Sequence, residues 1–168
     1  MDVVILAGGK GSRMDDALPK ALVSAHGKPI ISRQLDYISR FDIAKKFILA
    51  LGYKSEMVVD YVTKNYPGLD VSFSLEEKPL GTGGALKQAL SQSLSQTVLA
   101  LNCDDIIDID VCSLGSRTEN TLCIAHPHLP FGRVSVRNGY VERFYEKPLY
   151  SGWVSCGWYL LNREEMLK

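Results

Sequence analysis

Hydrophobic residues follow two alternating patterns along the chain: short apolar runs, and segments in which apolar residues recur at a helical spacing. The apolar runs predict buried strands at 2–7, 46–51, 69–75 and 97–102. Between them, a 3.6-residue spacing predicts helices over 29–41, 55–66 and 85–94. Strands that alternate with helices are typical of a parallel sheet covered on both faces. This half of the chain is therefore expected to be doubly wound.

The pattern changes after residue 115. Strand-like segments at 120–125, 133–137, 140–145 and 153–161 follow, and Asn138-Gly139 is a hairpin turn signal. Asn162 with acidic residues after it predicts the start of a last helix. The predicted fold is α/β: a Rossmann-like, doubly wound, mostly parallel sheet with helices on both faces and added antiparallel strands in the C-terminal half. No linker or repeat divides it, so residues 1–168 are expected to form a single domain.

Composition and charge exclude some classes of function. The 168 residues are 46% hydrophobic and 23% charged, which suits one globular domain with a sizeable core. Nineteen basic residues balance nineteen acidic ones, so neither nucleic acid nor a membrane surface is an expected partner. Without a signal sequence or an apolar run of membrane length, the expected location is cytoplasmic. Four widely spaced cysteines without a C-x-x-C pair are expected to be reduced thiols.

A glycine-rich loop follows the first strand directly. Gly8, Gly9 and Gly11 let backbone N–H groups approach a phosphate chain, and Arg13 and Lys20 add two cations close by. Two cations suit a triphosphate. The alternative is a plain turn with solvated basic side chains.

Carboxylates follow the fourth strand. Asp104 and Asp105 stand at its C-terminal end, where open α/β sheets bind their ligands. Carboxylate oxygen suits Mg²⁺, which keeps several waters and bridges to substrate phosphates. Asp104 is the expected metal ligand and Asp105 a second candidate. The alternative is a cap for a segment that starts near Asp108.

These segments resemble the signature of the sugar-1-phosphate nucleotidylyltransferases, which join a nucleoside triphosphate to a sugar 1-phosphate and release pyrophosphate. The matching sequences are LAGGKGSRM at 6–14, LPK at 18–20, EEKPLGTGGAL at 76–86, VLALNCDD at 98–105 and VERFYEKP at 141–148. Together they span most of the chain in the order that the family shows. A later segment, VSCGWY at 154–159, takes the place of the family's N-[AS]-G-I-Y strand.

The resemblance implies roles for individual residues. The catalytic residues would be Arg13, Lys20 and Asp104, with Asp104 binding Mg²⁺. The nucleotide would be bound by Leu6, Ala7, Gly8, Gly9, Gly11, Ser12, Arg13, Glu76, Pro79, Gly81, Thr82 and Gly83. The sugar phosphate would be bound by Lys20, Asp105, Glu146, Lys147 and Ser155, where Ser155 replaces the sugar-contacting amide of the family.

Several alternatives stay open. The family's second metal-binding aspartate lies beyond residue 168, so this is either a fragment, or a short form with an incomplete site, or a chain in which Asp105 or Asp108 substitutes. The segment at 80–86 and the short chain resemble guanylyl- and uridylyltransferases that act on heptose, mannose or N-acetylmuramic acid phosphates, and this resemblance favours GTP as the nucleotide. The chain could instead be a weakly catalytic nucleotide- or sugar-phosphate-binding module, or a cytidylyltransferase acting on a phosphorylated alcohol. An exposed strand edge could pair two copies into a homodimer.

Overall fold

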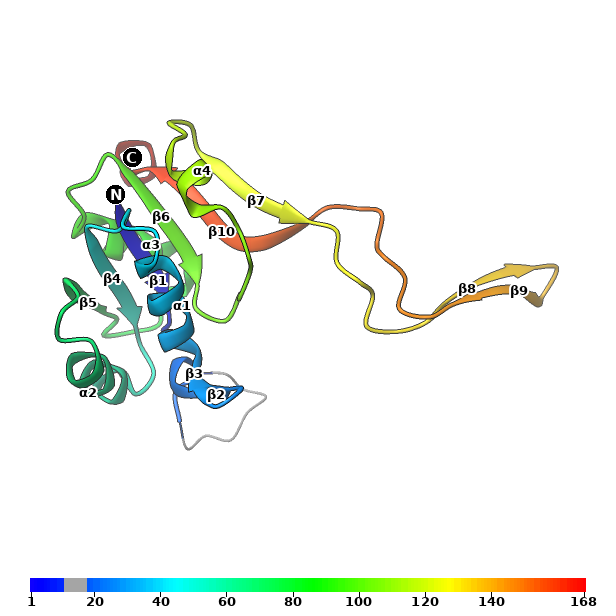
Figure 1. Cartoon of the computed structure of the whole chain (residues 1–168), viewed down its shortest axis with the longest axis horizontal. Coiled ribbons are helices and arrows are strands. Elements are labelled where there is room, and N and C mark those ends of the chain that lie inside the picture. Colours follow the sequence, from blue (N-terminus) through cyan, green and yellow to red (C-terminus); the bar gives the residue numbers. More distant parts are fainter. Residues whose placement is uncertain (11–17) are drawn as a thin grey trace.

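A six-stranded sheet, in the order β5-β4-β1-β6-β10-β7, forms the centre of the molecule (Figure 1). It is seen in a computed structural model that describes residues 1–10 and 18–168. The strands are β1 (Asp2–Leu6), β4 (Lys46–Leu51), β5 (Val71–Leu75), β6 (Thr97–Asn102), β7 (Thr121–Ala125) and β10 (Val154–Asn162). β1 pairs in parallel with β4 and β6, and β4 with β5, whereas β10 runs antiparallel to β6 and β7. The mixed, mostly parallel sheet confirms the predicted fold class.

Helices cover both faces of this sheet because its central strands are apolar on both sides. On one face, α1 (Ile30–Ser39), α2 (Ser55–Asn65) and α4 (Val111–Gly115) pack over a core that includes Val3, Ile5 and Trp158. On the other, α3 (Gly81–Ser91) and α5 (Arg163–Leu167) pack over Val4 and its neighbours. Successive residues of β1 thus enter opposite cores, as the two-residue period of a strand requires. Among the described residues, no helix is long and apolar enough to cross a membrane.

Element boundaries correct the sequence prediction in a few places. The third helix begins at Gly81 and ends at Ser91, not at residues 85 and 94, and Leu94 is exposed. Glycines at 81, 83 and 84 have low helix propensity and predicted a loop, but the turn into the helix is held by the Glu76 carboxylate, which accepts a hydrogen bond from the Leu80 amide at 2.8 Å. The strand predicted from residue 69 begins at Val71, and the first long helix ends at Ser39 rather than 41.

A short segment before α1 was not predicted at all. It consists of a 3-10 helix, η1 (Lys20–Leu22), and a small hairpin of β2 (Ser24–Ala25) and β3 (Lys28–Pro29). His26 and Gly27 make its turn with positive φ angles of 49° and 76°, the pair of left-handed residues that a tight hairpin needs. This segment places Lys20 beside the sheet.

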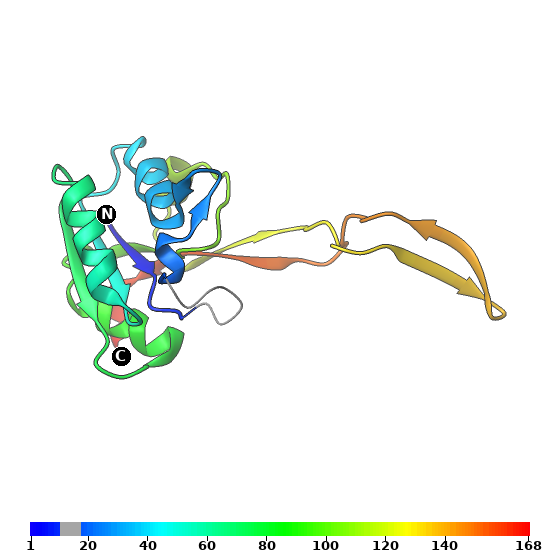
Figure 2. The ribbon, with the colours of Figure 1, turned by 90° about the horizontal axis from the view of Figure 1, so that it is seen from below.

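Residues 126–153 form an arm that extends away from the sheet (Figures 1 and 2). Its outer part is the hairpin of β8 (Arg133–Arg137) and β9 (Tyr140–Tyr145). Asn138 and Gly139 turn between them with φ angles of 52° and 83°, as their sequence predicted. Many large apolar side chains on the arm are exposed, among them Phe131, Val136, Tyr140, Val141 and Phe144.

Asp2 links the start of the sheet to the end of α3, and its charge is expected to stabilise the fold. The buried carboxylate accepts hydrogen bonds from the Ser93 hydroxyl at 2.7 Å and the Leu94 amide at 3.2 Å. Burial alone would raise the pKa of Asp2, but these hydrogen bonds outweigh it and hold the pKa below its ordinary value. A lowered pKa in the folded state gives stability that is complete above the unfolded pKa and is lost as pH falls through the folded one.

Asp2→Asn is therefore expected to lower the free energy of unfolding by about 1 kcal/mol at pH 7. Urea unfolding measured between pH 7 and pH 2.5 should show the wild type and the variant converging as the wild-type carboxylate is protonated. A difference that stayed constant over this range would mean that the charge of Asp2 contributes nothing.

Candidate active site

The chain reverses its direction of winding at β1. From β1 it passes through α1 to β4 and through α2 to β5, and it then returns through α3 to β6 on the other side of β1. In open α/β sheets, ligands bind outside the carboxyl ends of the strands at such a reversal. The ends of β1 and β6 are therefore the place where this fold favours a ligand.

A cavity of about 670 Å³ lies at this place, within the range of roughly 300–1,000 Å³ common for small-molecule sites. Its walls come from the ends of β1, β4 and β6, from η1 and from the segment that leads into α3. The lining residues that the sequence had singled out are Leu6, Ala7, Gly8, Gly9, Lys20, Glu76, Pro79, Gly81, Thr82 and Asp104. The fold thus gathers segments that are far apart in the sequence around one cavity.

Gly8 shows why the loop after β1 needs glycine. A Cβ atom there would lie 2.8 Å from Oε1 of Glu76 and 3.2 Å from the backbone nitrogen of Gly52. The Gly8 carbonyl also accepts a hydrogen bond from the Tyr53 amide at 3.2 Å, which joins this loop to the end of β4. The loops after two neighbouring strands can pack this closely only without side chains. Gly11, Ser12 and Arg13 lie outside the described residues, and their roles stay predictions.

The start of α3 forms another wall. Pro79, Gly81 and Thr82 line the cavity, whereas Gly83 does not. The first amide groups of a helix have no partner within the helix and carry a partial positive charge. This end of α3 therefore suits an electron-rich group such as the edge of a nucleobase or a phosphate.

Lys20 and Asp104 also line the cavity and are in contact with each other. The Lys20 ammonium donates a hydrogen bond to Oδ2 of Asp104 at 2.5 Å, and both side chains are partly exposed. Lys20 comes from η1 and Asp104 from the turn after β6, so the pair joins two segments that are remote in sequence. Asp104 does not act as a cap, because the N-cap of α4 is Asp110, which accepts from the Ser113 amide.

Asp105 has a different environment from Asp104. Its Oδ2 accepts a hydrogen bond from the Asn102 side chain at 2.8 Å, and it does not line the cavity. Its backbone carbonyl accepts from the indole N–H of Trp158 at 2.9 Å. The contacts of Asp105 are those of a structural residue that shapes the turn, and its predicted role toward the sugar phosphate stays a prediction.

The structure does not bring Glu146, Lys147 or Ser155 to the cavity. Glu146 and Lys147 follow β9 on the arm, where the Lys147 carbonyl is hydrogen-bonded to Nδ1 of His128. Ser155, in β10, accepts a hydrogen bond from the Gly157 amide at 3.2 Å. The predicted contacts of Glu146 and Lys147 with a sugar phosphate would require the arm and the cavity to approach one another, and the predicted role of Ser155 stays a prediction.

Tyr53 lines the cavity beside Gly52 but was not predicted from the sequence. The ammonium groups of Lys10 and Lys54 lie 5.6 Å and 5.3 Å from the centre of its ring, within the range of a cation–π interaction. A usable signal was present, because Gly52-Tyr53 follows a buried parallel strand directly and so had to lie at the ligand-binding edge of the sheet.

The side chains at the cavity fit a magnesium ion whose coordination is completed by phosphate oxygens and water. Among residues 1–10 and 18–168, no group of three or more His, Cys, Asp or Glu side chains could hold a metal. Mg²⁺, however, is commonly bound through one or two carboxylates together with substrate phosphates and water. Asp104 offers such a carboxylate in a cavity that is large enough for the phosphates.

Cys103 precedes Asp104 but is not an available nucleophile. Burial raises the pKa of its thiol to about 12, with a smaller contribution from the negative charge of Asp104. At pH 8 only about one thiol in ten thousand would be ionised, and the thiolate is the reactive form. Iodoacetamide at pH 8 is therefore expected to modify the exposed Cys112 and to spare Cys103 until the protein is unfolded. Peptide mass spectrometry would check this, and equal labelling of both residues in the native protein would contradict the burial of Cys103.

The fold and the cavity together define a class: an α/β protein with a cavity of small-molecule size at the reversal point of a mostly parallel sheet. A family model described as Nucleotidyl transferase matches residues 2–168. The chain belongs to this nucleotidyl transferase family.

Similar proteins agree with this assignment. A D-glycero-alpha-D-manno-heptose 1-phosphate guanylyltransferase of Aneurinibacillus thermoaerophilus is 32% identical over 97% of this chain and 75% of its own. A protein of the same name from Campylobacter jejuni is 30% identical over 98% and 77%. The crystal structure of HddC from Yersinia pseudotuberculosis complexed with GMP-PN is 27% identical, with a TM-score of 0.74 over 99% of this chain and 79% of that one.

Proposed function

We propose that this chain transfers a guanylyl group from GTP to a sugar 1-phosphate, with heptose 1-phosphate as the first acceptor to test, in a reaction that uses Mg²⁺. The observation that carries the proposal is the Lys20–Asp104 pair at the edge of a nucleotide-sized cavity. Its guanylyl and heptose specificity is supported by the two guanylyltransferases that are 30–32% identical to this chain.

The proposed chemistry is direct transfer. An oxygen of the sugar phosphate attacks the α-phosphorus in line, a P–O bond forms, and the bond to pyrophosphate breaks with its electrons going to the departing oxygen. Catalysis of this kind consists mainly of positioning and of neutralising charge. No covalent intermediate on the protein is needed, in agreement with the buried, protonated state expected for Cys103.

Different residues at the cavity would bind the nucleotide, align the reacting phosphates and hold the metal. The glycine loop and the start of α3 would hold the nucleotide, and Lys20 would align the reacting phosphates through its ammonium group. Asp104 would hold Mg²⁺, which when bound neutralises charge on the phosphate oxygens. Lys20 and Asp104 are already in contact, so a phosphate that reaches one of them lies beside the other. Arg13 would stabilise the leaving pyrophosphate.

Pyrophosphate release tests the proposal. Purified protein is incubated with Mg²⁺, one of GTP, ATP, CTP, UTP or dTTP, and one of a panel that includes heptose 1-phosphate, mannose 1-phosphate, N-acetylmuramic acid 1-phosphate and phosphocholine. Release with GTP and a sugar 1-phosphate, and with neither alone, is expected. Release with CTP and phosphocholine would favour the cytidylyltransferase alternative. No release from any pair, with nucleotide binding retained in calorimetry, would leave a binding module.

A further inference from the structure

Gln34 is a buried polar residue to which neither the sequence patterns nor the proposed chemistry gives a role. It lies in the middle of α1 with only 2% of its surface exposed. Its side-chain amide donates to the carbonyl of Cys103 at 3.0 Å and to the carbonyl of Asp105 at 3.1 Å. These are the residues immediately before and after Asp104. One amide group therefore spans the backbone on both sides of the proposed metal ligand.

A glutamine is well suited to this contact. Its NH₂ group has two hydrogens, and each is directed to a different carbonyl of the turn. A buried carbonyl that loses its hydrogen-bond partner is costly, so these two hydrogen bonds hold the turn against the helix. The Trp158 indole donates to the Asp105 carbonyl as well, at 2.9 Å. The backbone of the turn is thereby fixed on both sides of Asp104, while the Asp104 side chain extends toward the cavity.

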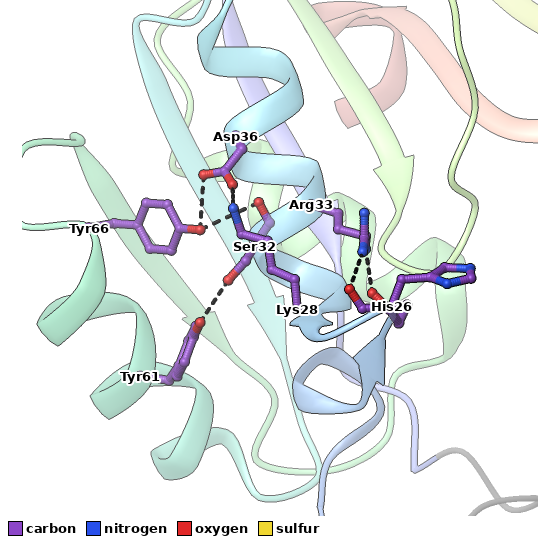
Figure 3. Close-up of polar contacts among 8 residues, drawn as sticks. His26, Lys28, Ser32, Arg33, Asp36, Tyr61 and Tyr66 are labelled. Carbon is purple, nitrogen blue, oxygen red and sulfur yellow. Dashed lines mark hydrogen bonds and ion pairs between the residues drawn. The ribbon is translucent and has the colours of Figure 1, made fainter.

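The same helix also holds the segment that carries Lys20. Arg33, next to Gln34, donates through Nε to the Ala25 carbonyl at 2.7 Å and through a terminal nitrogen to the His26 carbonyl at 2.9 Å (Figure 3). Ala25 and His26 belong to the hairpin that connects η1 to α1. Adjacent residues of one helix thus contact the turn that carries Asp104 and the hairpin that follows the Lys20 segment.

We infer that Gln34 is a positioning residue that sets the direction of the Asp104 carboxylate and so the affinity of the site for its divalent cation. Gln34 has this role only if Asp104 binds the metal as proposed above. Residues that orient metal ligands through hydrogen bonds typically change metal affinity by about 10–100-fold when they are replaced. Loss of the Gln34 amide is expected to weaken metal binding by an amount in this range.

The experiment uses Mn²⁺ as the probe, titrated with the full chain and a GTP analogue whose α–β bridge is methylene, and measures free Mn²⁺ by electron paramagnetic resonance. Gln34→Met keeps the length of the side chain without its donors and is expected to raise the Mn²⁺ dissociation constant about 10–100-fold. Gln34→His keeps one donor and should fall between Gln34→Met and the wild type, which provides a second reading should the methionine variant fail to fold.

Ser32→Ala is the matched control. Ser32 is buried on the same helix, but its hydroxyl is hydrogen-bonded to the Tyr61 hydroxyl on α2 and does not approach the cavity (Figure 3). Thermal denaturation should show a loss of stability in this variant, with Mn²⁺ affinity unchanged. In turnover, Gln34→Met should lower kcat and raise the Mg²⁺ concentration needed for half of full activity, without a matching rise in the KM of the sugar phosphate.

Asp104→Asn distinguishes a failure of the proposed metal site from a failure of the proposed role of Gln34. If this variant binds Mn²⁺ as tightly as the wild type, the proposed metal site is wrong whatever Gln34 does. If Asp104→Asn loses Mn²⁺ while both Gln34 variants bind it like the wild type, the metal site stands and the role of Gln34 is overturned. Equal weakening in Ser32→Ala and Gln34→Met would also overturn it, because a general loosening of α1 would then explain the effect.

Discussion

Asp104→Asn is expected to lower the rate of nucleotidyl transfer by about 10²–10³-fold, the usual cost of removing one preorganised electrostatic group from a transition state. The amide keeps the size of the side chain but removes the negative charge that faces Lys20 and that would hold Mg²⁺. Steady-state release of pyrophosphate at saturating substrate and Mg²⁺ measures the effect.

Asp108→Asn is the comparison for this variant. Asp108 follows on the same loop and accepts a hydrogen bond from the Tyr37 hydroxyl at 3.1 Å, but it does not line the cavity. Its replacement should leave the rate within a few-fold of the wild type. A large loss in Asp108→Asn with a near-normal Asp104→Asn would transfer the metal-binding role to Asp108.

Gly157→Ala is expected to lower the free energy of unfolding by about 3 kcal/mol, the sum of a left-handed backbone strain and a forced displacement of neighbours. Gly157 has a φ of 68°, and a Cβ there would lie 1.7 Å from Oδ2 of Asp105 and 2.6 Å from Nδ2 of Asn102. These two atoms are hydrogen-bonded to each other in the turn that leads past Asp104. The substitution should therefore reduce activity as well as stability.

Gly139→Ala isolates the backbone part of that effect. Gly139 also has a positive φ, of 83°, but a Cβ at this hairpin turn would meet no atom within 4 Å. Urea unfolding should show a loss of only about 1–2 kcal/mol, with activity retained. Equal losses in the two variants would mean that the close approach of the added methyl group to the Asp105 carboxylate costs nothing.

The sequence predicted most reliably what depends on burial. The strands at Lys46–Leu51 and Thr97–Asn102 have the predicted ends, because a strand covered on both faces leaves a continuous apolar run. The predicted start of α3 was wrong because glycines there favour a loop, whereas the helix is entered through a local hydrogen bond from the Leu80 amide to the side chain of Glu76, four residues earlier, which no hydrophobic periodicity reveals.

The candidate site was predictable wherever a residue follows a strand directly. Gly8 and Asp104 were assigned to one site on that basis, and both line the cavity. Lys20 reaches the cavity through the η1 segment, which no periodicity indicated; its assignment rested on its closeness in sequence to the glycine loop, and its role toward the reacting phosphates on the family resemblance. Gln34 could not be found at all, because a glutamine on the inner face of a helix has no pattern that reveals its partners.

Because of the position of β6 in the sheet, the backbone segments that carry Asp104 and Lys20 differ in the free energy needed to open them locally. β6 is hydrogen-bonded along its length to β1 on one side and to β10 on the other, so the strand that leads to Asp104 is of the kind whose local opening costs most. Lys20 lies on a three-residue 3-10 helix at the surface, a kind of segment that opens locally at much lower cost. The carboxylate side of the pair therefore follows a strand with hydrogen-bonded partners on both sides, whereas the lysine side belongs to a short segment outside the sheet.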